Sequence, residues 1–347
     1  HRRLAACKQA GTGAVPCFVL DLDPLQQLEA MVTENCQREQ LTVLEEADAI
    51  QGMLDLGATT ASVAHQLGAL ERKGYLREEA NRYGLTALEV PDYLGGRYSA
   101  LSAVGLLPAA FLGIDWQALL DGAASVAKPL VQTPELVAEH PSFALACWAK
   151  ALEDHDYSQL IFFSYIPQWA AYGDWFAQLW AESLGKDGQG SQPVPATGVT
   201  DQHSINQMFL SGPRNKGCIF LTSRDQAQGP NFGMDVPDVW AWLRAKPFGS
   251  LLEAEALGTR MALCQSGVPL LHVEMHNSGP RAAGSLMLLL EAATLFTGWL
   301  MGINPLDQPA VELGKRLANA RLGAGGYVKE EADLAEYLAV PREEQCF

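Results

Sequence analysis

The stretch SQLIFFSYIPQWAAYGDWFAQLWAES, residues 158–183, decides the fold class of this chain. Its first eight residues, Ser158–Tyr165, form an apolar run of strand length. The segment Gln168–Ser183 then repeats large apolar side chains at helical spacing. These are Trp169, Tyr172, Phe176, Leu179 and Trp180. A buried strand followed by such a helix is the repeating unit of α/β folds with parallel sheets.

The same alternation continues toward the C-terminus and predicts an α/β fold with a mainly parallel sheet. Gly217–Thr222 and Val268–Val273 are the further strand candidates, and Leu251–Cys264 has the pattern of a helix. The polar stretch Gly185–Gly198 is expected to be a loop.

The composition is that of a globular protein with a sizeable core and an acidic surface. The 347 residues are 48% hydrophobic and 18% charged, and this length favours two domains. The 24 Lys and Arg against 40 Asp and Glu give a net charge of -16, which disfavours a nonspecific grip on nucleic-acid phosphates. The seven cysteines contain no C-x-x-C pair, and their odd number argues against a disulfide framework. We therefore expect a cytoplasmic protein.

One apolar stretch, Ala282–Ile303, is long enough to cross a membrane. Glu291 lies in its middle and the turn-like pair Asn304-Pro305 ends it, so we expect a buried core helix and no membrane partner. The chain begins at His1 and no apolar signal-peptide core follows, so we expect no export signal and a missing natural start.

Four motifs carry side chains suited to work on an anionic ligand. The first is GGRYS, residues 95–99, where paired glycines let a ligand approach the backbone and an arginine can meet a phosphate or a developing oxyanion. Taken alone, it is also the pattern of a turn with a surface arginine.

The second is the i, i+4, i+8 series of Gln178, Glu182 and Lys186, which predicts three side chains along one helix face. An exposed salt bridge on a solvated helix is the alternative.

The third motif is TDQHS, residues 200–204, whose threonine or aspartate could cap a helix running to Phe209. His203 would then lie near its first turn and exchange protons near neutral pH, or it is an ordinary surface histidine. The fourth is GINPLDQPAVELGK, residues 302–315, a turn followed by a helix that carries Lys315. This lysine either donates to a sugar ring oxygen or is simply solvated.

His272, Glu274 and His276 lie at the end of a strand candidate and suggest a metal site. A pair of ordinary histidines at a strand end explains the same residues more simply, so we predict no metal there.

In this order, the four motifs resemble those of the phosphoglucose isomerase family. The resemblance begins near Ala69 and continues to near the C-terminus. LREEANRYGLTALEVPDYLGGRYSAL, residues 76–101, resembles the end of the family's first sugar-isomerase domain, and Asp174–Lys315 resembles most of the second. It implies a first domain that continues over 69–130 and a second over 131–347. The implied fold is a parallel-sheet sandwich with helices on both faces.

The resemblance implies interconversion of glucose 6-phosphate and fructose 6-phosphate, a step of glycolysis and gluconeogenesis. Glu182 matches the catalytic base that moves a proton between C1 and C2 of the open-chain sugar through a cis-enediol. Arg97 matches the arginine that stabilises charge on this intermediate, and His203 and Lys315 match residues that assist ring opening. The chemistry agrees, because a carboxylate can take a carbon-bound proton only where the resulting oxyanion is stabilised.

Substrate binding is implied for Gly96 and Gln178. The family forms homodimers in which the residue matching His203 reaches the neighbouring active site, and it uses no metal or organic cofactor. It also carries a Ser/Thr-rich phosphate-binding loop upstream of its Gly-Gly-Arg motif, for which we find no match. The nearest candidate, Thr59–Ser62, is explained by a helix N-terminus. A chain without this loop loses charge-assisted bonds to the phosphate, so its activity is in doubt.

Residues 1–68 instead resemble the N-terminal part of ParB-type partition proteins and predict a small, mostly helical segment. HRRLAACKQAGTGAVPCFVLDLD, residues 1–23, resembles their arginine-pair motif and the strand after it, and ENCQRE, residues 34–39, resembles their E-N-x-Q-R motif. In that family both motifs contact the phosphates of CTP. The corresponding positions are Arg2, Arg3, Glu34, Asn35 and Arg38.

The partition resemblance ends at Gly68, before any DNA-recognition helix. Residues 1–68 carry 4 Lys or Arg and 9 Asp or Glu, a net charge of -5, so nucleic acid is not an expected partner. Two alternatives to the isomerase stay open at this point: a fragment of a CTP-binding partition protein, and a non-functional fusion.

Overall fold

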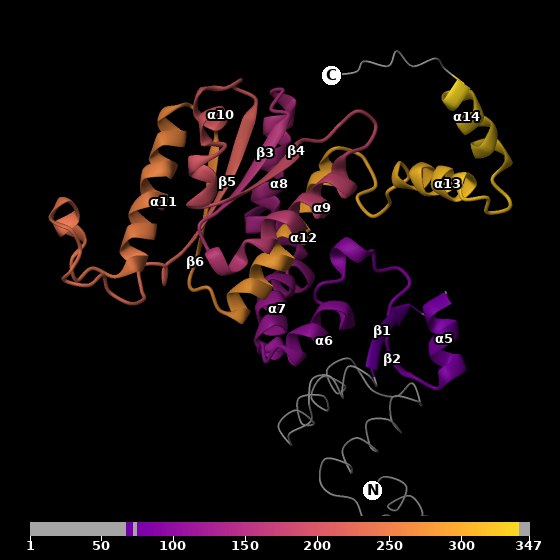
Figure 1. The fold of residues 1–347 in the computed structure, drawn as a ribbon, viewed down its shortest axis with the longest axis horizontal. Coiled ribbons are helices and arrows are strands. Elements are labelled where there is room, and N and C mark those ends of the chain that lie inside the picture. The colour runs from indigo at the N-terminus through magenta and orange to yellow at the C-terminus, as the bar shows by residue number, and fades with distance from the viewer. Residues whose placement is uncertain (1–66, 72–74, 340–347) are drawn as a thin grey trace, which may run out of the picture. The chain divides into compact units, whose positions relative to one another are not determined.

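The computed structural model describes residues 67–71 and 75–339 (Figure 1). Contacts within the chain divide it into two compact units, residues 1–94 with 102–114 and residues 95–101 with 115–347. The partition-type positions between Arg2 and Arg38 lie outside the described residues.

The described part of the first unit is a small α/β arrangement. Strands β1 (Leu67–Glu71) and β2 (Thr86–Val90) pair in parallel, and α5 (Tyr75–Tyr83) lies between them in the chain. Alternate residues of β2 are buried, as expected for a strand with one face on a core. The helix α6 (Ala103–Phe111) contacts both strands.

The second unit contains a four-stranded parallel sheet in the order β4-β3-β5-β6. The strands are β3 (Gln159–Ser164), β4 (Gln192–Thr197), β5 (Lys216–Ser223) and β6 (Leu270–Met275). This arrangement confirms the predicted α/β fold with a parallel sheet. The three strands predicted from apolar runs are β3, β5 and β6, and each prediction is within two residues of the observed bounds.

Helices cover both faces of this sheet (Figure 1). On one face, Phe209 of α10 (Asn206–Ser211) and Leu263 of α11 (Phe248–Gln265) join the core around Phe163. On the other face, Phe162 stacks on Phe176 of α9 (Ala171–Leu184) with 4.9 Å between the ring centroids. Full burial of such a side chain contributes about 1.5–3 kcal/mol, so both core layers stabilise the fold.

The remaining elements complete the second unit. They are α7 (Trp116–Gln132), α8 (Pro141–Asp154), α12 (Pro280–Leu300), α13 (Val311–Arg321), α14 (Val328–Ala339) and the 3-10 turns η1 (Gly96–Tyr98), η2 (Pro134–Glu139), η3 (Pro167–Trp169), η4 (Thr200–His203) and η5 (Asp238–Leu243). The predicted helices at 168–183 and 251–264 correspond to η3 with α9 and to α11. The boundaries near residues 68 and 130 stay predictions, although α7 continues through residue 130 without a break.

The loop predicted for Gly185–Gly198 is wrong in part, because strand β4 occupies Gln192–Thr197. Its sequence, QPVPAT, contains two prolines and lacks the apolar run that marks the other strands. Proline cannot donate a ladder hydrogen bond and is therefore confined to sheet edges. β4 pairs only with β3 within this sheet, and its edge position tolerates Pro193 and Pro195.

The long helix α12 packs against α7, α8 and α9. Among the described residues it alone is long and apolar enough, by length and composition, to cross a membrane, but 56% of its most apolar window is buried inside the protein. Two glycines let it approach α7 closely: a Cβ on Gly284 would lie 1.9 Å from the Leu119 carbonyl oxygen, and one on Gly122 would lie 1.9 Å from that of Arg281. These contacts support the prediction of a core helix.

The same helix buries an acidic side chain, Glu291, of which only 7% is exposed. Its Oε1 atom accepts no hydrogen bond within the described part of the chain. Burial disfavours the charged form and raises the pKa of Glu291 to about 8, against about 4.5 in an unfolded chain. The folded protein therefore binds more protons than the unfolded one between these two values, so its stability falls as the pH rises from 4.5 to 8 and is level on either side.

We expect Glu291→Gln to remove this pH dependence. In the original chain the free energy of unfolding should fall between pH 5 and 8.5 by an amount on the order of 4 kcal/mol, and in the variant it should stay nearly level. All eight tryptophans belong to the second unit, so urea unfolding followed by their fluorescence reports on this core. The exposed Glu331→Gln serves as the control, and an equal pH slope in both variants would contradict the assignment.

Candidate active site

The motif at residues 95–99 places Arg97 inside the second unit, with 2% of the side chain exposed. η1 forms one tight turn here, closed by bonds from the Ser99 backbone N–H and hydroxyl to the Gly96 carbonyl oxygen. A Cβ on Gly96 would meet no atom within 4 Å, so open space lies beside this glycine. The alternative of a turn with a surface arginine is therefore wrong, because the arginine points inward.

Every N–H of the Arg97 guanidinium is used. Nε donates to Ser183 Oγ at 2.8 Å, and Nη1 donates to Glu182 Oε2 at 3.3 Å and to Gln308 Oε1 at 2.9 Å. Nη2 donates to the carbonyl oxygens of Pro305 at 2.9 Å and Asp307 at 3.0 Å. Five donors meeting five acceptors satisfy a guanidinium completely. Arg97 therefore joins helix α9 to the loop before α13.

Glu182 lies on the last turns of α9 and receives contacts on both carboxylate oxygens. Oε1 accepts from Gln178 Nε2 at 3.3 Å, one helical turn earlier, and Oε2 accepts from Arg97. The prediction that Gln178 and Glu182 share one helix face is confirmed. The Glu182 side chain keeps 31% of its surface exposed, so the carboxylate is oriented by the protein and still open to a ligand.

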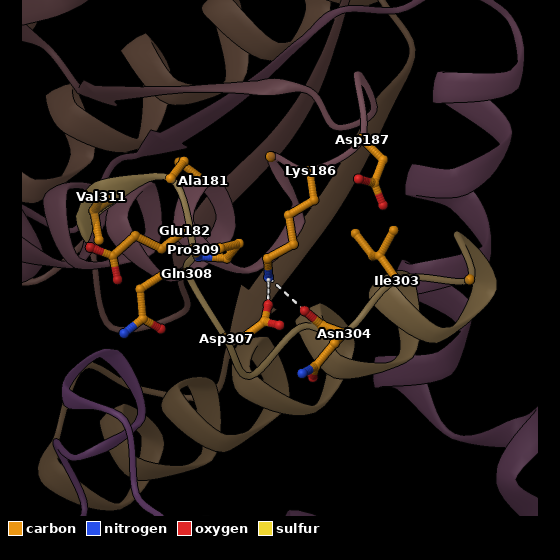
Figure 2. A pocket seen from close by; sticks show the side chains of 13 residues that line it. Ala181, Glu182, Lys186, Asp187, Ile303, Asn304, Asp307, Gln308, Pro309 and Val311 are labelled. Atoms are coloured by element: carbon orange, nitrogen blue, oxygen red, sulfur yellow. Dashed lines mark hydrogen bonds and ion pairs between the residues drawn. The ribbon is translucent and has the colours of Figure 1, made fainter. Parts of the chain in front are cut away.

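The third residue of the predicted helix face does not lie on the helix. α9 ends at Leu184, Gly185 caps it, and Lys186 follows outside. Its ammonium group contacts the Asn304 carbonyl oxygen at 2.5 Å and pairs with Asp307 Oδ1 at 3.1 Å (Figure 2). It also donates to the Ser183 carbonyl oxygen at 2.8 Å. The helix ends before the i+8 position, so the prediction for Lys186 is wrong. The alternative, an exposed salt bridge on this helix, is not formed either, because the described residues Glu182 and Lys186 do not pair.

A cavity of about 630 Å³ opens beside Glu182 (Figure 2). The end of α9 forms one wall, and the turn between α12 and α13 forms the other. Its charged and polar lining residues are Glu182, Lys186, Asp187, Asn304, Asp307 and Gln308. This volume suits a small ligand that meets the Glu182 carboxylate and the Gln308 amide.

Gln308 and Ser183 belong to the site and were not among the predicted site residues. Both bind the Arg97 guanidinium directly. Gln308 lies inside the fourth motif, where a polar residue before a proline was the available signal. Ser183 gave no signal in the sequence, because its role depends on an arginine 86 positions away.

His203 and Lys315 lie apart from this group. His203 is exposed on η4, and Lys315 is 65% exposed on α13, where it pairs with Glu312 at 2.7 Å. Neither residue lines the cavity beside Glu182. The fourth motif does form the predicted turn and helix, but within the described chain no hydrogen bond links either residue to Glu182.

The predicted helix cap before His203 is wrong. Residues 200–209 form two short pieces, η4 and the start of α10, and neither begins with a side-chain cap. The Asp201 carboxylate instead accepts from the Thr197 backbone N–H at 2.7 Å and from the Ser204 hydroxyl at 3.1 Å. It therefore ties the turn to the end of β4.

The three residues of the metal hypothesis each have other partners. His272 lies 2.8 Å from the Thr222 hydroxyl, and partial burial together with nearby Arg260 holds the pKa of this histidine below its usual value. A hydrogen bond from Arg224 lowers the pKa of Glu274, and the same arginine lies 3.4 Å from His276. Among the described residues, no group of three or more His, Cys, Asp or Glu is placed to hold a metal ion.

The comparisons with known proteins concern the family and the fold of the chain. The chain is 40% identical over 264 residues to a probable glucose-6-phosphate isomerase of Natronomonas pharaonis, a match that covers 75% of this chain and 60% of that protein. A crystal structure of a hypothetical protein from Thermus thermophilus superposes with a TM-score of 0.70 at 30% identity, covering 88% of this chain and 76% of the other. A glucose-6-phosphate isomerase structure from Chlamydia trachomatis has a TM-score of 0.64 at 21% identity over 86% of this chain and 61% of that one, and so shows the shared fold.

The chain thus spans about 60% of the length of the curated relative. The sequence model described as phosphoglucose isomerase matches residues 18–225. This match enters the segment that resembled a partition protein, and neither the model nor the relatives support that resemblance. Since the family model covers more than half of the chain, the chain belongs to the phosphoglucose isomerase family.

Proposed function

We propose that this chain is a cytoplasmic aldose-ketose isomerase that interconverts glucose 6-phosphate and fructose 6-phosphate. One observation carries the proposal: a carboxylate, Glu182, is held 3.3 Å from the buried guanidinium of Arg97 at the edge of a cavity. The names of the relatives, glucose-6-phosphate isomerases, supply the substrate.

Proton transfer between C1 and C2 needs one base and one source of positive charge. Glu182 takes the proton from C2 of the open-chain aldose, the C2–H electrons form the C1=C2 bond, and the carbonyl electrons move to the C1 oxygen. The C1 oxygen then gains a proton and the C2 hydroxyl loses one by exchange with water, and the protonated Glu182 returns its proton to C1 as the C2 carbonyl forms. The enediol that forms in between carries negative charge on oxygen, which the fixed charge of Arg97 stabilises. Because all N–H donors of this guanidinium are already bonded, it acts through its position and charge and needs no rearrangement.

Gln178 and Gly96 play supporting parts in this proposal. The amide of Gln178 fixes one carboxylate oxygen of Glu182 and so limits how the base can rotate. The open space beside Gly96 allows the sugar to approach the backbone next to Arg97.

Ring opening is assigned to His203 and Lys315, with His203 supplied by a second subunit of a homodimer. Its exposure and its absence from the cavity lining support a role outside its own chain. The segment between β5 and α11 also exposes large apolar side chains, which are typical of a surface that a partner covers. These are Met234, Val239, Trp240 and Trp242.

No observation favours the partition alternative. The residues that would contact CTP lie outside the described part of the chain, and the family match overlaps their segment from residue 18 onward. Because we find no match for the family's phosphate-binding loop, we still expect the chain to bind the substrate's phosphate weakly and to turn over slowly.

Glu182→Gln tests the base. Removing the ionisable group should lower kcat in a coupled isomerase assay by at least about 10²-fold and leave the melting temperature unchanged. Glu135→Gln, on an exposed turn, is the matched control and should behave as the original chain does. Turnover that survives Glu182→Gln would refute the assignment.

Arg97→Lys tests the charge and its geometry. Lysine has three donors for the five acceptors, so buried carbonyl oxygens lose their partners and the charge moves away from Glu182. We expect kcat/KM to fall on the order of 10²-fold and stability to fall by roughly 2 kcal/mol. Arg281→Lys, in the exposed pair with Asp121, is the control for the same substitution. Equal effects at both positions would show that Arg97 has no special role.

Mixing two inactive variants tests the homodimer. When Glu182→Gln and His203→Gln chains are co-expressed, random pairing makes half of the dimers mixed, and each mixed dimer contains one intact site. Turnover should therefore recover to about a quarter of the original value. If His203 serves its own chain, or if the protein is a monomer, the mixture should stay as inactive as its components.

A further inference from the structure

Two cations bind the same short loop. Arg97 binds the carbonyl oxygens of Pro305 and Asp307, and Lys186 binds that of Asn304. Three backbone acceptors of the turn between α12 and α13 are thus held by side chains from elsewhere in the unit. The turn also bonds internally, since the Leu306 N–H donates to the Asn304 side-chain oxygen at 3.1 Å.

Lys186 connects this loop to the end of the helix that carries Glu182. Besides its contacts with the loop, the Lys186 ammonium group donates to the carbonyl oxygen of Ser183 in the last turn of α9. Ser183 is the neighbour of Glu182 in the chain. A cation at this position also suits the partial negative charge of a helix C-terminus. One ammonium group therefore fixes the distance between α9 and the loop that positions Gln308.

The contacts of Lys186 leave it no donor for a substrate. An ammonium group has three N–H bonds, and three acceptors are already present. Only 10% of the Lys186 side chain is exposed, whereas Asp307 is 53% exposed, so the two carbonyl bonds lie in the more enclosed part of the contact. An exposed ion pair contributes little by itself.

We infer that Lys186 is a positioning residue for the isomerase reaction: it holds the loop at residues 304–308 against α9 and so keeps Arg97 and Gln308 at their distances from Glu182. This inference rests on the proposed function. It assigns a role to a residue that does not touch the reacting carbons. A displacement of about 1 Å at such a site can reduce a rate on the order of 10²-fold, so the effect should be measurable.

Three variants separate the contacts. Lys186→Met keeps the apolar stem and removes all three donors; we expect kcat to fall by about 10- to 100-fold with KM changed less than about threefold. Lys186→Arg retains donors and should recover a large part of kcat. Asp307→Asn removes only the ion pair and keeps the carbonyl oxygen that Arg97 binds, so kcat should fall by less than it does in Lys186→Met. Lys150→Met, which breaks a pair with Asp154 on the surface of α8, is the matched control.

The outcomes decide between positioning and its alternatives. A rise in KM with kcat unchanged would mean that Lys186 binds substrate, and an unchanged Lys186→Met enzyme would mean that the contact is unimportant; either result overturns the inference. If the original chain has no turnover, the proposed function fails, and hydrogen exchange then tests the inference by itself. Amides of residues 302–309 should exchange faster in Lys186→Met than in Lys150→Met, and equal exchange would overturn it.

Discussion

The arrangement of the site depends on one buried cation. A guanidinium removed from water is strongly unfavourable unless its donors are satisfied and its charge is compensated. Arg97 meets both conditions, through three carboxyl, amide or hydroxyl side chains and two carbonyl oxygens. These acceptors come from α9 and from the turn before α13, so the arginine can be buried only if both segments are in place. Folding of the second unit and assembly of the site are therefore coupled.

A second set of hydrogen bonds reinforces this coupling. Ser183 accepts from Arg97 and also lies 2.9 Å from the Tyr98 hydroxyl, and that hydroxyl reaches the Pro305 carbonyl oxygen at 3.3 Å. Burial raises the pKa of Tyr98, so its phenol stays protonated and can donate. Adjacent residues of one motif thus hold the same helix and the same loop. An interior network with every member paired favours a single arrangement.

The sequence predicted well those parts of the structure that local pattern determines. β3 and β5 are buried on both faces and therefore appear as continuous apolar runs, and α9 repeats its aromatic residues with the period of a helix. β4 was missed because it has no such run and contains two prolines, which its edge position tolerates. Lys186 was placed wrongly because a spacing rule does not register where a helix ends. The meeting of Arg97 with Glu182, 85 positions apart, follows from tertiary structure, and family resemblance alone pointed to it.

The charges of the site indicate which part of the proposed substrate it can hold. The described residues that line the cavity include three acidic side chains, Glu182, Asp187 and Asp307, and one cation, Lys186, whose donors are already used. Arg97 is equally saturated. A phosphate dianion placed among these groups would meet mainly negative charge, so its anchor must come from outside these cavity walls. For the substrate proposed above, this charge pattern favours the uncharged, reacting end and leaves phosphate recognition to other segments.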